Sequence, residues 1–171
     1  MKRGVVRPLL APRLYFKRRG RRERGGPQRI IEMKENEITQ QIIGAAIEVH
    51  KELGPGIVEK PYEESLCHEM HLRNLQFCRQ RAVPISYKGV KLSTNLWLDL
   101  LVEERVIVDL KAKEEVTALD RMKLLTYLRL SRLRVGLIIN FHVERLTDGV
   151  VRVVNRFAEE NGGGEQPDLK S

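Results

Sequence analysis

Apolar residues recur every three to four positions between residues 36 and 75, a spacing typical of helices. Residues 36–53 show this period, with Asn36 as the expected N-cap and a Gly-Pro pair directly after the last turn. A second helix is predicted from Val58 to Leu75. Pro61 is tolerated in its first turn because the first amides of a helix have no intrahelical acceptor. The pattern therefore predicts two consecutive amphipathic helices.

The apolar period then changes to two, which is typical of strands. Short turns are expected at Lys88-Gly89 and at residues 103–105, so that neighbouring strands pair antiparallel. The strands predicted in this part are Phe77–Tyr87, Val90–Leu92, Leu96–Val102 and Val106–Lys111. Together they form an antiparallel meander.

A third helix and two further strands complete the pattern. Thr117 and Asp120 resemble a capping box and predict a helix that runs through Ser131. Its buried side is expected to include Leu119, Met122, Leu125 and Leu128.

A strongly apolar strand, Val135–Phe141, follows this helix, and a last strand is predicted at Val150–Val154. The succession of strand, helix and apolar strand is a crossover unit, whose last strand suits an interior and parallel position. The fold class is therefore α/β, a mixed sheet flanked by helices.

Two charged side chains interrupt the segment VIVDLK at residues 106–111. Because successive side chains of a strand alternate between faces, Asp109 and Lys111 share one face with Ile107. A second carboxylate, Asp99, lies nearby in LWLDLLV. Burying a charge is unfavourable without a partner, so these groups need a counter-ion, water or a metal. A divalent cation is the partner that this arrangement favours.

Composition limits the class of protein. A chain of 171 residues with 42% hydrophobic content is large enough for one domain with its own core, and it contains no run of 18 apolar residues that could span a bilayer. Cys67 and Cys78 do not form a disulfide framework and no Cys pair completes a zinc site. We interpret both as reduced core thiols of a cytoplasmic protein.

The net charge of +8 is concentrated at one end of the chain. Residues 1–32 hold eleven Lys or Arg and two acidic residues, a net charge of +9, so the rest of the chain sums to −1. We predict a basic disordered extension at 1–32, a domain at 33–155 and a disordered tail at 156–171. The extension is either a non-specific phosphate-binding arm or translated upstream sequence; a targeting peptide is disfavoured because no apolar core of signal length is present.

One motif gives these elements a family resemblance. The segment Gly56-Ile-Val-Glu59-Lys-Pro-Tyr62, with HKELGPG, YKGVKLSTN, VIVDLKA and LRVGLIINF around it, resembles the GxxExxY protein family, within the PD-(D/E)XK nuclease superfamily. The resemblance covers about Glu37 to Val154. It implies a restriction-endonuclease-like core.

The resemblance also implies a site. Glu59, Asp99 and Asp109 would coordinate Mg²⁺ or Mn²⁺, and Lys111 would contact the attacking water or the scissile phosphate. Mg²⁺ prefers oxygen ligands and retains waters, which leaves positions for phosphate and nucleophile. The implied reaction is hydrolysis of phosphodiester bonds in DNA, less favourably in RNA. Nucleic acid is the expected partner, a membrane is not, and a homodimer is compatible with the chain.

The chain departs from the superfamily pattern at two positions. Leu98 precedes Asp99 where Pro is expected, a change in backbone shape rather than in ligands. Many relatives carry Gln four residues before Tyr in the next helix, whereas this chain has Lys123 and Tyr127, which share one helix face. Lys123 could contact phosphate or compete for the carboxylates.

Each candidate also has a purely structural interpretation. Glu59 suits the first turn of a helix because of the helix dipole. Asp109 and Lys111 could form a surface ion pair, and Asp99 a surface acid beside a turn. Tyr62 is more readily explained by core packing, although its hydroxyl could orient Glu59. The alternative function is accordingly a catalytically inactive module that binds nucleic acid or protein.

Overall fold

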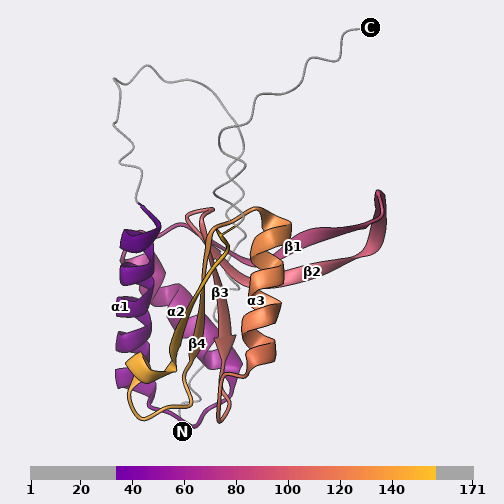
Figure 1. The fold of residues 1–171 in the computed structure, drawn as a ribbon. Helices are drawn as coiled ribbons and strands as arrows, with labels where there is room; N and C mark the ends of the chain where they lie inside the picture. Colours follow the sequence, from indigo (N-terminus) through magenta and orange to yellow (C-terminus); the bar gives the residue numbers. More distant parts are fainter. Residues whose placement is uncertain (1–33, 157–171) are drawn as a thin grey trace, which may run out of the picture. The chain divides into compact units, whose positions relative to one another are not determined.

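The computed structural model describes residues 34–156, which form one five-stranded mixed sheet with helices on both faces (Figure 1). The strand order is β1-β2-β3-β4-β5. The elements in chain order are α1 (Glu35–Leu53), α2 (Glu59–Leu72), β1 (Phe77–Tyr87), β2 (Val90–Val102), β3 (Val106–Lys111), α3 (Ala118–Ser131), β4 (Val135–Asn140), η1 (Leu146–Gly149) and β5 (Val150–Val154). The predicted extension 1–32 and, apart from Arg156, the tail 156–171 lie outside the described residues.

The sheet topology confirms the α/β prediction. β1, β2 and β3 pair antiparallel, β3 and β4 pair parallel, and β4 and β5 pair antiparallel. α3 connects the two parallel strands, as expected for a crossover. β3 is thus an interior strand, and five of its six residues are buried.

The two faces of β3 belong to two apolar clusters. Val106, Val108 and Leu110 pack in the cluster that α1 and α2 complete, while Ile107 packs in the cluster beneath α3. The alternation predicted from VIVDLK is therefore present. The charged residues of β3, Asp109 and Lys111, lie at the end of the strand.

The predicted N-cap of the first helix was wrong. α1 begins at Glu35 with Lys34 at the cap position, and the Lys34 amide donates to Glu37 Oε2 at 3.1 Å. Asn36 lies inside the helix, where its side-chain oxygen accepts a hydrogen bond of 2.7 Å from Arg152 of β5. The Asn36 side chain, which the local pattern assigned to capping, thus binds a residue 116 positions away in the sequence.

Two predicted boundaries also differ. α2 ends at Leu72 rather than Leu75, because Asn74 adopts a positive φ of 59° and turns the chain, so that Leu75 is buried beyond the helix. β2 is one continuous strand where two short strands were predicted. Its polar central part, residues 93–95, is held extended because it belongs to a long hairpin with β1.

The predicted buried side of α3 was largely wrong. Leu119 and Met122 are 73% and 64% exposed, Leu125 is half-buried and only Leu128 lies in the core as predicted; Leu124 and Tyr127 are also buried.

The orientation of α3 is set at its first turn. Asp120 binds Thr117 and Lys113 there, and residues 120, 124, 127 and 128 follow one another at helical spacing on a single face. Fixing Asp120 beside β3 therefore turns that face toward the sheet. No helix among residues 34–156 is long and apolar enough to cross a membrane.

A glycine after β4 gives a test of how tightly the end of the sheet is packed. A Cβ on Gly149 would overlap the carbonyl oxygen of Asn140. We expect Gly149→Ala to lower the free energy of unfolding by about 1–3 kcal/mol, measured by urea denaturation.

Gly44→Ala is the matched control. Its Cβ would meet only the flexible end of Arg73, and alanine is favoured over glycine inside a helix by about 0.8–1.0 kcal/mol. Equal stability changes in the two variants would contradict the packing assigned to Gly149.

Candidate metal centre

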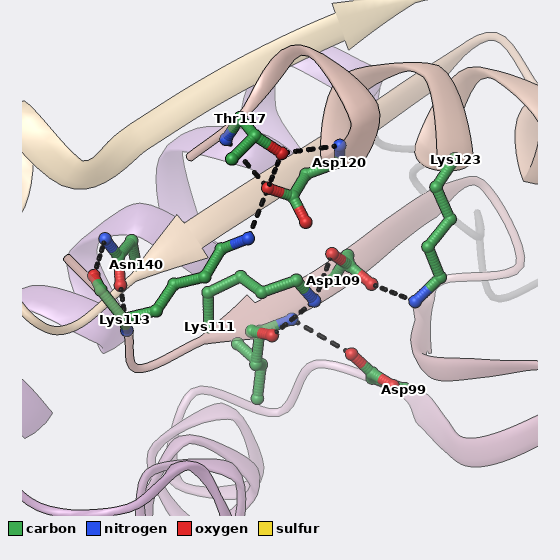
Figure 2. Close-up of polar contacts among 9 residues, drawn as sticks. Asp99, Asp109, Lys111, Lys113, Thr117, Asp120, Lys123 and Asn140 are labelled. Carbon is green, nitrogen blue, oxygen red and sulfur yellow. Dashed lines mark hydrogen bonds and ion pairs between the residues drawn. The ribbon is translucent and has the colours of Figure 1, made fainter. Parts of the chain in front are cut away.

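A buried carboxylate at the end of β3 forms the centre of the site. Asp109 is 2% exposed. The ammonium of Lys111 lies 2.5 Å from its Oδ2, and the ammonium of Lys123, from α3, lies 3.4 Å from its Oδ1 (Figure 2). Two cations from two elements therefore neutralise one carboxylate, which the interior of a sheet requires.

The two lysines hold Asp109 in different ways. Lys123 donates a hydrogen bond to Oδ1, whereas Lys111 donates its hydrogen bond to the carbonyl of Leu110 at 2.8 Å and approaches Oδ2 as a close charge. Oδ2 is buried and has no hydrogen-bond donor among the described residues. Its close partner there is the Lys111 ammonium at 2.5 Å, so a further ligand would have to share or replace that contact.

Asp99 lies on β2, the strand beside β3. The β2–β3 ladder ends at the pair Leu100 and Val108, one residue before Asp99 would face Asp109. Instead, Asp99 Oδ2 accepts a hydrogen bond of 3.0 Å from the Leu110 amide. A side chain replaces a ladder bond here, so regular pairing of the two strands ends before Asp99 and Asp109.

The hairpin also changes direction at Asp99. Gln80 of β1, which the register places opposite Asp99, has a positive φ of 48° and is absent from the ladder. Leu98 packs in the α3 cluster but Leu100 packs in the α1–α2 cluster, although residues two apart normally share a face. Bulge-like irregularities of this kind re-aim side chains beside functional sites.

Glu59 is the first residue of α2 and lies at the surface. Partial burial of the carboxylate raises its pKa; Lys111 opposes this shift, while the negative charges of Asp99 and Asp109 add to it. Glu59 is therefore within electrostatic reach of every charged group of the site. Burial is the main cause of the raised pKa, and the two lysines and the two aspartates act on it in opposite directions.

The pKa values of two more groups reflect the same crowding. Burial raises the pKa of Asp99, and the charge of Asp109 raises it further, against the effect of the Leu110 amide. Burial by itself would lower the pKa of Lys123, but the Asp109 carboxylate outweighs it and the pKa is raised. Lys123 is thus held charged beside Asp109.

Tyr62 and Tyr127 support the site from two sides. Tyr62 is fully buried, stacks on Phe141 at 4.3 Å and donates a hydrogen bond of 2.6 Å to the Gly54 carbonyl. Its hydroxyl thus fixes the turn before α2 rather than Glu59. Tyr127 lies beneath Lys123, whose ammonium is 5.2 Å from the ring centroid.

Sequence reasoning missed the contacts that fix the end of β3. The Asn140 side chain accepts from the Lys113 amide at 3.1 Å and donates to the Lys113 carbonyl at 2.7 Å, and Lys113 Nζ binds Asp120 at 2.5 Å (Figure 2). Asn140 is 2% exposed. A lone amide inside the apolar run VGLIINF was the available signal.

The donor set suits a hard divalent cation, although it is not assembled as a complete ligand group. Within residues 34–156 no three His, Cys, Asp or Glu side chains are close enough together to hold a metal. Asp99 and Asp109 provide oxygen donors from adjacent strands, and Oδ2 of Asp109 lacks a hydrogen-bond donor. Mg²⁺ and Mn²⁺ accept such ligands and complete their shells with water, so two carboxylates fit.

Fold and site together define a restriction-endonuclease-like α/β protein, with a mixed sheet that carries a carboxylate pair and a lysine. A protein-family model described as PD-(D/E)XK nuclease superfamily matches residues 36–153. The chain belongs to this superfamily, whose members are nucleases that generally use divalent metal ions. No curated protein and no solved structure matches the chain.

The raised pKa of Asp99 gives a test by pH. Without metal, a folded-state pKa above the ordinary value of 3.8 means that the folded protein binds the proton more tightly, so stability falls as pH rises through that pKa. We expect Asp99→Asn to raise Tm at pH 7 and to remove this decline, since an amide oxygen still accepts from Leu110.

Asp120→Asn is the control of opposite sign. Although burial raises its pKa, hydrogen bonds from Lys113 and Thr117 dominate and hold it well below the ordinary range. Its contribution to stability is present above pH 3.8 and is lost on acidification, so this variant should melt lower at pH 7. Tm shifts of the same sign at pH 7 would refute the assignment.

Proposed function

We propose that the protein is a metal-dependent phosphodiesterase that hydrolyses DNA, and RNA less favourably. The observation that carries the proposal is the buried Asp109 carboxylate, which lies beside Asp99 and is paired with Lys111 in a nuclease-superfamily domain. Within that superfamily we place the chain in the GxxExxY protein family, on the motif from Gly56 to Tyr62.

Asp99 and Asp109 would hold Mg²⁺ or Mn²⁺, and Glu59 would complete the site from α2. The bound ion lowers the pKa of a water and offsets charge that develops on the phosphate. Burial raises the pKa values of Asp99 and Glu59 and the Asp109 charge raises both further, so a cation between these carboxylates would favour their charged forms. Asp99 and Glu59, whose charged forms are disfavoured in the metal-free protein, would thus serve as ligands of the ion.

Lys111 is the fixed cation of the site. Its side chain is 14% exposed, and the Leu110 carbonyl and Asp109 hold its ammonium from two sides. We assign Lys111 to the attacking water or the scissile phosphate, where a preorganised charge stabilises the transition state.

Lys123 is the movable cation. Its side chain is 43% exposed and lies on a helix, so it can leave Asp109 without breaking the sheet. With a metal held by Asp109, the Lys123 ammonium would be free to leave Oδ1 and to contact phosphate. In this role it replaces the Gln that many relatives carry.

The second candidate function is an inactive module that binds nucleic acid or protein. The specific observation in its favour is that Lys111 and Lys123 already neutralise Asp109, so the carboxylate is balanced without metal. A cytoplasmic location, a homodimer, and the domain limits with a basic arm at 1–32 stay predictions under either function.

Cleavage assays separate the two functions. We expect the natural sequence to nick plasmid DNA with Mg²⁺ or Mn²⁺, and Asp109→Ala and Lys111→Ala each to lower the rate by at least about 100-fold, as for loss of a preorganised charged group. Asp148→Ala, which removes an exposed acid of η1, is the control and should cut normally. Thermal melts must show that each variant is folded.

Equal residual cleavage in folded variants would refute the proposed site. DNA binding that survives both chelation and Asp109→Ala, with no cleavage by the natural sequence, would favour the inactive module instead.

Lys123→Gln tests the competition between the lysine and the metal. Removing the ammonium frees Oδ1 of Asp109, so Mn²⁺ should bind several-fold tighter in calorimetric titrations, as expected from a charge within about 4 Å. Arg121→Gln, an exposed position on the same helix, is the matched control and should leave the affinity unchanged. If Lys123→Gln weakens Mn²⁺ binding or leaves it unchanged, the lysine does not compete.

A further inference from the structure

The β1–β2 hairpin continues well beyond the rest of the sheet (Figure 1). β2 pairs with β3 only from Leu100 to Val102, so within residues 34–156 the segment 90–98 of β2 pairs with β1 alone. We call residues 81–98 the arm. Its base is the irregularity at Gln80 and Asp99, so the arm starts at the candidate metal centre.

The arm carries positive charge and no negative charge. Residues 81–98 contain no Asp or Glu and three cationic residues, Arg81, Lys88 and Lys91. Outside residues 1–32 the chain sums to −1. Arg81 is paired with Glu104, so the positive charge of the arm comes mainly from Lys88 and Lys91 beside its turn.

Large apolar side chains are exposed on the same arm. Tyr87 and Val90, partners beside the turn, are 63% and 65% exposed, and Trp97 is 54% exposed. Val83 and Leu98, by contrast, are buried against α3. One side of the arm is thus anchored to the domain, and aromatic and aliphatic groups remain in solvent.

The edges of the arm carry features that disfavour strand addition. Pro84 lies within β1, the register shifts between Pro84 and Ser86, and Lys91 lies near the tip. Proline, bulges and lysine are the devices with which proteins blunt exposed edges. The exposed aromatic groups are therefore not explained by edge pairing with a peptide or a second copy.

Cations interleaved with exposed aromatic rings fit single-stranded nucleic acid. Lysines track the phosphates and rings stack on unpaired bases, whereas a duplex leaves no base face free for Trp97. Trp97 precedes Asp99 by two residues, about 7 Å along a strand. A nucleic-acid strand bound at Trp97 would therefore lie close to the base of the arm, where Asp99 is.

We propose that the arm binds a single-stranded segment of nucleic acid and delivers it to the carboxylates at its base. The delivery step rests on the proposed function, because it assumes that the carboxylates at the base of the arm act on the bound strand. The binding itself is independent of cleavage.

The test uses the full chain, a fluorescently labelled 20-nucleotide DNA strand and its duplex, with EDTA present so that no cleavage occurs. We expect Trp97→Ala to weaken binding of the single strand about tenfold, within the range for loss of one stacking ring. Trp97→Phe should retain most of the affinity. Leu72→Ala, an equally exposed apolar residue at the end of α2, is the control and should bind normally.

A second pair of variants tests the cations. Lys88→Glu/Lys91→Glu should reduce the slope of log affinity against log salt by about 1.4, at about 0.7 per phosphate contact on a single strand. Lys51→Glu/Arg156→Glu changes the net charge equally outside the arm and should alter the slope less.

Several outcomes would contradict the proposal that the arm binds a single strand. These are no single-strand binding by the natural sequence at low salt, equal losses in arm and control variants, or a Trp97→Ala change that dissociates a dimer in sedimentation and leaves binding intact. If the arm variants bind normally while DNA is still cut, the proposed role of the arm is wrong and the proposed nuclease function is retained. If binding depends on the arm but nothing is cut, the proposed role of the arm is retained and the proposed nuclease function is wrong.

Discussion

The charge of Asp109 is the constraint on which the other parts of the site depend. A carboxylate that is 2% exposed inside a sheet needs compensation, and Lys111 and Lys123 provide it from β3 and α3. The pairing links the central strand to the crossover helix. Both oxygens of the carboxylate therefore face a lysine ammonium, Oδ1 that of Lys123 and Oδ2 that of Lys111.

The surrounding structure accommodates this carboxylate at the expense of regular pairing. The β2–β3 ladder ends before Asp99, whose side chain takes the Leu110 amide, and Gln80 leaves the β1–β2 ladder opposite it. Asn140 and Lys113 fix the backbone just beyond β3. Irregular pairing on one side and a fixed strand end on the other thus frame the buried carboxylate.

The sequence was sufficient to predict the element types, the meander and the parallel crossover, because hydrophobic period and turn residues are local signals. It was insufficient for the buried face of α3 and the cap of α1. Both depend on distant contacts, Asp120 with Lys113 and Asn36 with Arg152. For the site, alternation along VIVDLK was enough to place Asp109 beside Lys111, but the reach of Lys123 and the contacts of Asn140 are tertiary.

The central claim is that Asp109 is a metal ligand whose charge the two lysines balance until the ion binds. Crystals grown with Mn²⁺ and measured for anomalous scattering test it most directly. The account predicts an anomalous peak at ligand distance from carboxylate oxygens of Asp99 and Asp109, with the Lys123 ammonium displaced from Oδ1. Both lysines still paired with Asp109, and no peak at ligand distance from it at saturating Mn²⁺, would contradict the account.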